Sequence, residues 1–159
     1  MRIAKGSFIM AIAIAALSCD RQALYEQYVS LPDTRWHADS TAVFTIDVPD
    51  TTNGYDLEVL LRSNEKFPYS NLYLFIEWQG ENQSRIDTLE HLMALPEGKW
   101  TGKGYGALKE NVIRYKMNYR FDRKEKVRLS FRQGMRDLHL NGVEDVGFRF
   151  SLSQENTSK

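Results

Sequence analysis

The sequence predicts an all-β fold, an antiparallel β-sandwich or jelly-roll-like single domain, behind a cleaved N-terminal segment. Three observations support this prediction. Apolar residues alternate with polar ones in short runs along most of the chain, which is the period of half-buried strands. Polar turn residues separate these runs. The 141 residues that follow residue 18 are enough for one domain with one hydrophobic core.

The N-terminal segment has the composition of a secretory signal peptide. Arg2 and Lys5 make its start positive, and the apolar run 8–17 is too short to span a bilayer as a helix. The single cysteine, Cys19, follows at once. Bacterial lipoprotein processing needs a cysteine at the cleavage point, because the thiol receives a diacylglyceryl group and the freed amine is acylated. We expect a lipoprotein signal peptide over 1–18 and lipidation of Cys19. The alternatives are an ordinary signal peptide that ends before Cys19, or a buried thiol.

The sequence predicts that the first half of the mature chain forms a tether followed by strands. Residues 19–35 are expected to form a lipidated N-terminal tether lying on the domain, although an amphipathic turn or two of helix also fits. The β-sandwich domain is expected over 36–153. Its first alternating runs are 44–48 and 55–61, and a turn joins them. That turn contains Pro49, Asp50, Asn53 and Gly54.

The middle of the chain predicts a hairpin and a long loop. Residues 72–79 begin apolar on both faces, as a central strand does. A turn over 80–83 leads to a returning strand over 85–93, where apolar residues also fit a helical period. The stretch 96–106 is rich in glycine and predicts an irregular loop whose aromatic residues fold back on the core.

Residues 108–121 fit two structures. A helix would align Leu108, Val112, Tyr115 and Tyr119, whereas a strand places five alternating apolar residues on one face, from Ile113 to Phe121. We prefer the strand because aromatic residues favour it. The strand predicts that Met117 points inward and Lys116 outward. Runs at 127–131 and 146–152 complete the sandwich, and 154–159 is a polar tail.

No sequence pattern indicates catalysis or a cofactor. The glycine-rich stretch 98–106 lacks both phosphate-binding spacings, G-x-x-x-x-G-K-[ST] and G-x-G-x-x-G. No G-x-S-x-G elbow occurs, and no two carboxylates stand out as a glycosidase pair. His37, His91 and His139 lie far apart in sequence and form no short-range zinc pair. We therefore expect no enzyme and no cofactor.

Two ligand-binding alternatives remain at this stage. Four oxygen-bearing side chains around one turn suit calcium, although turn formation explains them equally well: Asp47, Asp50, Asn53 and Asp56. Trp36, Trp78 and Trp100 suit a sugar-stacking platform, although core packing is the simpler explanation. A ligand- or glycan-binding envelope module is thus the alternative function, and it would expose Trp36 or Trp100.

Charge is distributed unevenly. Residues 109–136 hold ten basic and three acidic residues, a local charge of +7, whereas the rest of residues 19–159 sums to −9. The net charge of −2 favours no nucleic acid as a partner. A partner-binding basic face is predicted if the two strands of this region are neighbours, with a solvated, neutralised face as the alternative. Its residues are Arg114, Lys116, Arg120, Arg128 and Arg132.

The chain resembles the gliding motility lipoproteins called GldH, of the Bacteroidota. The resemblance spans nearly the whole mature chain and depends on several short runs. These are Cys19-Asp20, Tyr25 and Tyr28, Trp36-His37, residues 67–73 (FPYSNLY), 87–90 (DTLE), 98–100 (GKW), 102–106 (GKGYG), 133–136 (QGMR) and 143–149, which includes DVGF.

The resemblance implies a lipid-anchored, non-enzymatic accessory protein of the cell envelope, in a gliding machinery linked to type IX secretion. The family supplies no catalytic residues, and only the lipid-bearing cysteine transfers, onto Cys19. The expected partners are the membrane, through the lipid on Cys19, and other gliding or secretion proteins of the envelope. Of the two membranes, the outer one is preferred.

Overall fold

A computed structural model describes residues 23–104 and 106–154 of the chain. The predicted signal peptide, Cys19 and residues 155–159 lie outside these ranges. The described part contains strands and one short 3-10 helix, η1. In chain order these are β1 (Ala23–Ser30), η1 (Pro32–Thr34), β2 (Arg35–His37), β3 (Ala42–Asp47), β4 (Tyr55–Ser63), β5 (Asn71–Gln79), β6 (Ser84–Leu92), β7 (Lys109–Tyr119), β8 (Lys126–Gln133), β9 (His139–Asn141) and β10 (Val143–Leu152).

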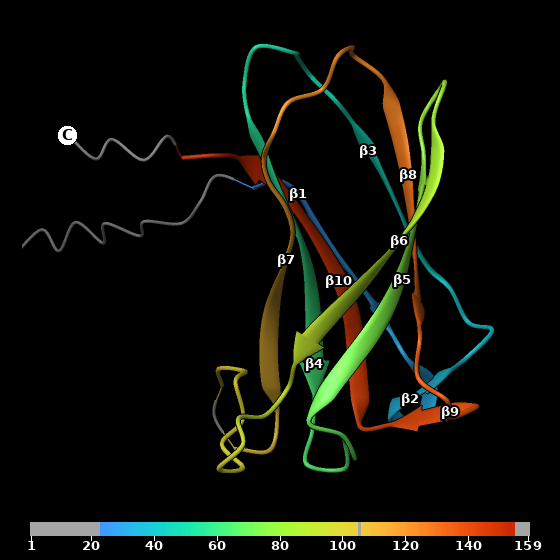
Figure 1. The fold of residues 1–159 in the computed structure, drawn as a ribbon, viewed down its shortest axis with the longest axis vertical. Helices are drawn as coiled ribbons and strands as arrows, with labels where there is room; N and C mark the ends of the chain where they lie inside the picture. Colours follow the sequence, from blue (N-terminus) through green and yellow to red (C-terminus); the bar gives the residue numbers. More distant parts are fainter. Residues whose placement is uncertain (1–22, 105, 155–159) are drawn as a thin grey trace, which may run out of the picture.

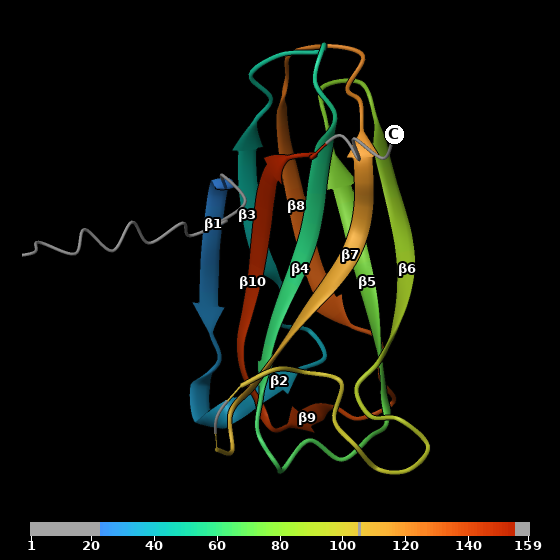
Figure 2. The same cartoon turned by 90° about the vertical axis from the view of Figure 1, so that its left-hand side faces the viewer.

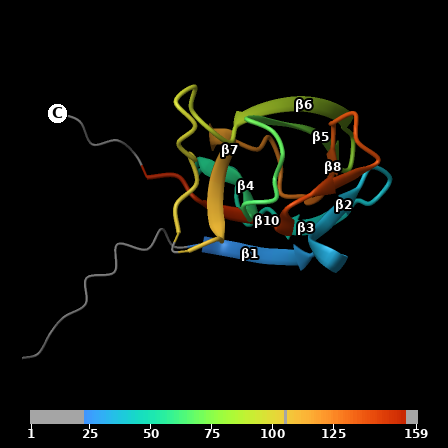
Figure 3. The same cartoon turned by 90° about the horizontal axis from the view of Figure 1, so that it is seen from below.

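The strands form two facing antiparallel sheets (Figure 1). One, called the β1 sheet, has the order β1-β10-β4-β7, and the other, called the β3 sheet, has the order β3-β8-β5-β6. Figure 2 shows the β1 sheet in front of the β3 sheet, and Figure 3 shows the two layers end-on. A short β2-β9 ribbon lies at one end. The predicted antiparallel β-sandwich is thus confirmed. Within the described ranges no helix is long and apolar enough to cross a bilayer.

The core lies between the two sheets and is rich in aromatic side chains. The alternation of β3 is exact in its burial, because every second residue is buried and the others are exposed. Near the end that carries the β3–β4 turn, Trp78 stacks on Phe121 with ring centroids 5.7 Å apart. Tyr55 stacks on Phe150 at 4.7 Å. Such pairs contribute about 0.5–1.5 kcal/mol each beyond the burial of their area.

The predicted tether contains a strand of the β1 sheet. Residues 23–30 form β1, which pairs with β10 from Ala23↔Ser151 to Ser30↔Asp145. Tyr25 and Val29 pack against the core. The sandwich therefore begins at Ala23 and not at residue 36, because backbone pairing and two inward side chains hold this segment on the sheet. The segment lies on the domain, as expected of the tether, but it does so as a paired strand, and the helical alternative is wrong.

The strand predictions for 85–93 and 108–121 are confirmed as β6 and β7, and the helical alternatives are wrong. The predicted inward positions of Tyr115 and Tyr119 hold, because both pack against the core, but the predicted position of Met117 does not. The pairing with β4 shifts register on both sides of Leu57, which lies opposite Lys116. Asn118 takes a left-handed conformation, with φ of 48°. These bulges turn Met117 outward, where it is 41% exposed, and place Lys116 opposite an inward-facing residue.

Candidate functional site

The five predicted basic residues do not share one surface. β7 is the edge of the β1 sheet, whereas β8 lies within the β3 sheet, so the two strands are not neighbours. Arg114 is exposed on the β1 sheet. Lys116 approaches Asp87 at 3.6 Å, and Arg120 donates to the carbonyl of Thr52 at 3.1 Å. The predicted single basic face is therefore absent from the described sandwich. Only Arg128 and Arg132 share an outer face.

The outer face of the β1 sheet is covered by its own charged side chains. Arg149 lies between two acids, with Nε 2.6 Å from Glu26 Oε2 and Nη1 3.5 Å from Glu58 Oε2. Glu58 points away from the core, yet it is only 1% exposed. The pKa of Arg149 is raised, mainly because its guanidinium donates a hydrogen bond to the carboxylate of Glu26. The single cation of this row is therefore paired with two acids.

A second row crosses the same face. Arg62 Nε lies 2.8 Å from Glu110 Oε2, and Nη1 lies 3.7 Å from Asp145 Oδ2. The guanidinium also stacks 3.9 Å above the ring centroid of Tyr28, whose hydroxyl donates to Glu110. Burial, and then the negative charge of Glu110, raises the pKa of Tyr28 to about 12.

A glycine makes room for that tyrosine. A Cβ on Gly147 would lie 2.6 Å from Cδ1 of Tyr28, so the ring occupies the space that a side chain would need. Leu60, which pairs with Gly147, is fully buried although its side chain points outward. On the outer face of the β1 sheet, Arg62 and Arg149 are therefore held in ion pairs, and exposed Val112 and Arg114 lie at its β7 edge.

The outer face of the β3 sheet has a different character. Four large apolar residues are exposed there: Val43, Tyr73, Ile86 and Leu92. Ile86 is 64% exposed and Leu92 is 54% exposed. Arg128 and Arg132 stand among them, and in the described part of the chain neither forms an ion pair. The guanidinium of Arg132 lies 5.7 Å from the ring centroid of Phe75. Exposed apolar surface with unpaired cations is typical of an interaction site.

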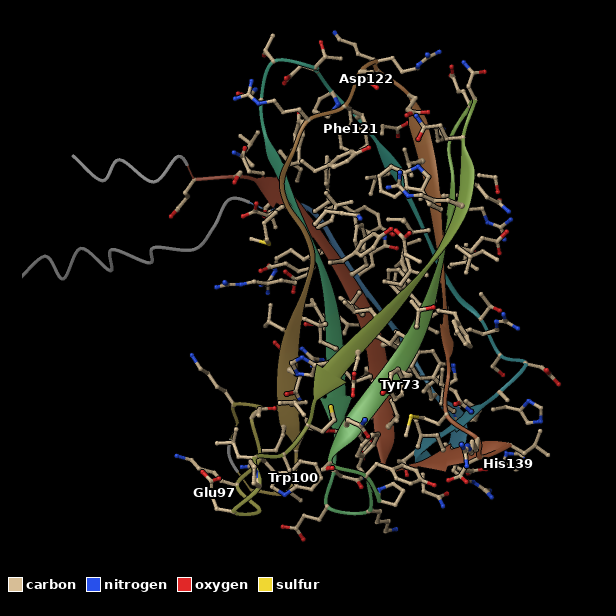
Figure 4. The ribbon with its side chains drawn as sticks, in the orientation of Figure 1. Tyr73, Glu97, Trp100, Phe121, Asp122 and His139 are labelled. Carbon is tan, nitrogen blue, oxygen red and sulfur yellow. The ribbon has the colours of Figure 1, made fainter. Side chains whose placement is uncertain are left out.

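A groove of about 380 Å³ opens at one end of this face. Two segments line it, one at the start of β5 and one directly after β8: Tyr69, Asn71 and Tyr73, then Gly134, Met135 and Arg136. Figure 4 places Tyr73 toward the end that carries Trp100 and His139, away from Phe121. Sequence reasoning did not identify the groove, although both segments belong to runs that carry the family resemblance.

The edges of the two sheets meet at β6 and β7 through a cluster around Asp87. The hydroxyl of Tyr115 donates to Asp87 Oδ2 at 2.5 Å, and Arg85 Nε lies 3.4 Å from the same oxygen. The guanidinium of Arg85 also lies over Trp78, 4.5 Å from the ring centroid. The hydrogen bond from Tyr115, and then the charges of Lys116 and Arg85, lower the pKa of Asp87. The cluster joins two edge strands, so its evident role is structural.

The proposed calcium ligands are used in other ways. Asp50 Oδ1 accepts the backbone N–H groups of Thr52 and Asn53 at 3.0 and 2.9 Å, which forms the turn and lowers the pKa of Asp50. Asp56 accepts the backbone N–H of Asn118, and Asp47 pairs with Lys126 at 3.6 Å. Among the described residues, no group of three or more histidine, cysteine or acidic side chains is arranged to hold a metal.

Two histidines come together in the structure, and the tryptophans pack into or against the core. His37 and His139 are directly paired on β2 and β9, with ring centroids 4.7 Å apart, although they are distant in sequence. Trp36 is fully buried and donates Nε1–H to the carbonyl of Ser40 at 3.0 Å, so it lacks the exposure that the alternative glycan-binding role would need. Trp100 is half-buried and packs edge-on against Phe67 at 6.4 Å. Core packing thus accounts for Trp36.

Comparison with known proteins identifies the family. The model of the GldH lipoprotein family matches residues 23–150. A gliding motility lipoprotein GldH homolog of Christiangramia forsetii is 39% identical over 162 aligned residues, which cover 96% of this chain and 99% of the relative. The gliding motility lipoprotein GldH of Flavobacterium johnsoniae is 35% identical over 157, covering 94% and 97%. No solved structure matches. The chain therefore belongs to the GldH lipoprotein family, as a membrane-anchored envelope lipoprotein with an accessory role in gliding motility.

Proposed function

We propose that the protein is a non-enzymatic component of the gliding apparatus, anchored in the outer membrane by lipid on Cys19, that binds another envelope protein with the outer face of its β3 sheet. The names of both relatives describe a lipoprotein of gliding motility and mention no reaction, which supports a non-enzymatic role. The link to type IX secretion is part of the same proposal and comes from the family resemblance.

The contrast between the two outer faces carries the proposal. On the β1 sheet, Arg62 and Arg149 are each paired with two acids. On the β3 sheet, Arg128 and Arg132 are exposed and lie beside exposed apolar side chains. Neither arginine has an ion pair in the described part of the chain, and an acidic partner would supply one. The β3 sheet is therefore the face suited to a partner.

The anchor is tested with Cys19→Ala in the full chain. Because the cysteine precedes β1, the variant is expected to fold normally but to leave the membrane fraction. The wild-type protein is expected in the outer-membrane fraction, with a mass increased by its acyl chains. A variant that remained acylated and membrane-bound would refute the lipid site.

The binding face is tested by the double reversal Arg128→Glu and Arg132→Glu, expressed in a gliding host that lacks its own copy. A charge-matched control reverses Lys99 and Lys103, which are exposed in the loop before β7. Exposed substitutions change stability by about 0.5 kcal/mol or less, so both variants are expected to fold. Only the first is expected to reduce gliding. Equal gliding by both variants would contradict the proposed face.

A further inference from the structure

The strand β5 extends beyond its neighbour β8 at the groove. β8 pairs with β5 only from Leu74↔Gln133 to Gln79↔Arg128. The next backbone contact is the N–H of Gly134, which donates to the carbonyl of Tyr73 at 2.7 Å. After that the chain turns away, so the side of β5 that faces β8 has no paired strand next to Asn71 and Tyr73. An incompletely paired strand is a template for another chain.

The backbone N–H of Tyr73 has a poor acceptor at this edge. It donates to Sδ of Met135, 3.4 Å away. A thioether sulfur is a weak acceptor, whereas backbone N–H groups in sheets are normally bound by carbonyl oxygens. Met135 has a flexible side chain, and it lies half-buried in the place that a neighbouring strand would occupy. A peptide carbonyl that replaces the sulfur would therefore form a stronger hydrogen bond.

Arg136 is the one charged residue among the described residues that line the groove. Two acids lie beside the lining and accept hydrogen bonds from neutral groups, Asp137 from the hydroxyl of Tyr69 at 2.7 Å and Glu90 from the amide of Asn71 at 2.8 Å. Arg136 is exposed and has no ion pair with any residue of the described ranges, and the same is true of Arg132. Charge complementarity thus favours an acidic occupant.

We propose that the groove binds an extended, acidic segment of a partner protein, which adds to β5 as a short strand. Its carbonyl accepts from the N–H of Tyr73 in place of Met135 Sδ. Its carboxylate pairs with Arg136, and an adjacent apolar side chain lies against Tyr69. This is recognition by β-strand addition, in which main-chain hydrogen bonds supply affinity and side-chain pockets supply specificity. This inference depends on the proposed function, because the inference names the binding site and the kind of partner that the proposed function needs.

The position of the groove suits this role. Ala23, the first described residue, pairs with Ser151, which in turn pairs with Asp56 near the start of β4. The groove lies on the other sheet, toward the end of the sandwich where β4 ends and the chain enters β5. Figure 4 places Tyr73 toward that end. A protein tethered before Ala23 therefore presents the groove away from its anchor.

The test uses the full lipoprotein purified in detergent micelles and two synthetic peptides. Both alternate Thr and Val, and the central residue is Glu in one and Lys in the other. The Glu peptide is expected to shift the amide NMR signal of Tyr73, to slow its hydrogen exchange, and to bind at least tenfold more tightly than the Lys peptide. Arg136→Glu is expected to reverse the preference, and the control Lys99→Glu to leave it unchanged.

A second variant tests the sulfur contact. Met135→Leu keeps an apolar side chain of similar size but removes the acceptor. The amide of Tyr73 is expected to exchange faster in the free variant, and the Glu peptide to bind several-fold more tightly, because no sulfur competes with it. Unchanged exchange and affinity would overturn the role assigned to Met135.

Three results would overturn the groove proposal: equal binding of the two peptides, binding that leaves the Tyr73 amide unshifted, or occupation of the groove by an oligosaccharide or a second copy instead. The two proposals fail separately. If the peptides do not bind but reversal of Arg128 and Arg132 still reduces gliding, the groove proposal fails and the proposed function stands. If Cys19→Ala and the double reversal have no effect on anchoring or gliding, the proposed function fails whatever the peptides do.

Discussion

Asp87 shows how one carboxylate can join two sheets. It lies on β6, at the edge of the β3 sheet, and its contacts Tyr115 and Lys116 belong to β7, at the edge of the β1 sheet. Side chains connect these strands, because β6 and β7 belong to different sheets. The contact depends on ionised Asp87, which accepts the hydroxyl of Tyr115 and attracts two cations. The contribution of this cluster to the free energy of unfolding should therefore depend on pH.

The first prediction follows from the sign of that pKa shift. The folded protein holds the pKa of Asp87 below the ordinary value of 3.8. The stabilisation is therefore fully present above that value and is lost as pH falls through the lower folded value. We expect Asp87→Asn to reduce the free energy of unfolding by about 1 kcal/mol at neutral pH and by less near pH 2, because a charged acceptor is replaced by a neutral one.

Urea unfolding of wild type and variant at the two pH values measures this difference. Tyr115→Phe is the companion variant, since it removes the same hydrogen bond from the other side and should show the same pH trend. If the free energy of unfolding falls by the same amount at both pH values, packing and not the charge of Asp87 holds β6 against β7.

At the scale of the element, β7 shows what two bulges do to a strand. Ile113 faces the core and is buried, in register with Val59. Beyond Arg114 the extra residues change which side chains face inward, so that Met117 turns to solvent and Lys116 reaches Asp87. A bulge re-aims side chains in this way because it places two residues opposite one.

The second prediction compares two apolar residues of this strand. Ile113→Ala should reduce the free energy of unfolding by about 2–5 kcal/mol, because it leaves a cavity between the sheets. Met117→Ala should cost about 0.5 kcal/mol or less, as exposed substitutions usually do. Denaturant titration of both variants gives the comparison. Similar large losses would indicate that β7 continues its alternation through Met117.

The sequence alone predicted where the strands lie better than it predicted which strands pair and which side chains face the core. Alternation indicated strands over 44–48, 55–61 and 127–131, because one face of each strand is buried and the period is two residues. Alternation failed to predict the inward face of β7 at Met117. A bulge leaves the composition of a strand unchanged but shifts which residues face the core. Alternation also missed β1, since the partly exposed edge strand buries only Tyr25 and Val29.

The candidate binding surface was even harder to predict from the sequence than the strands. A run of basic residues over 109–136 does not reveal that the chain crosses from one sheet to the other between β7 and β8. The groove is harder still to predict, because Tyr73 and Met135 lie far apart in the chain and meet only through the pairing of β5 with β8. Nothing in the local sequence reports that Met135 supplies the acceptor for a backbone N–H.

At the scale of the whole molecule, the position of β1 limits how the domain can sit on a membrane. Cys19 precedes Ala23 by four residues, and an extended chain spans about 3.5 Å per residue, so the lipid would lie within about 14 Å of the start of β1. The nine residues of β4 span about 30 Å at about 3.3 Å each, and the groove lies on the other sheet toward their far end. The lipid on Cys19 and the groove are thus proposed to act at opposite ends of the sandwich.

The last prediction tests this orientation by photo-crosslinking. A photoreactive residue at Leu24 is expected to label lipid, whereas one at Arg136 is expected to label protein, because only the first lies within the reach of the anchor. Inserting a flexible segment of 20 Gly and Ser residues before Ala23 adds a mean reach of about 25 Å. The insertion should therefore abolish lipid labelling at Leu24 and leave the domain membrane-bound. Lipid labelling at Arg136 in the unmodified chain would show that the groove faces the bilayer, and an acidic protein segment could not then be its partner.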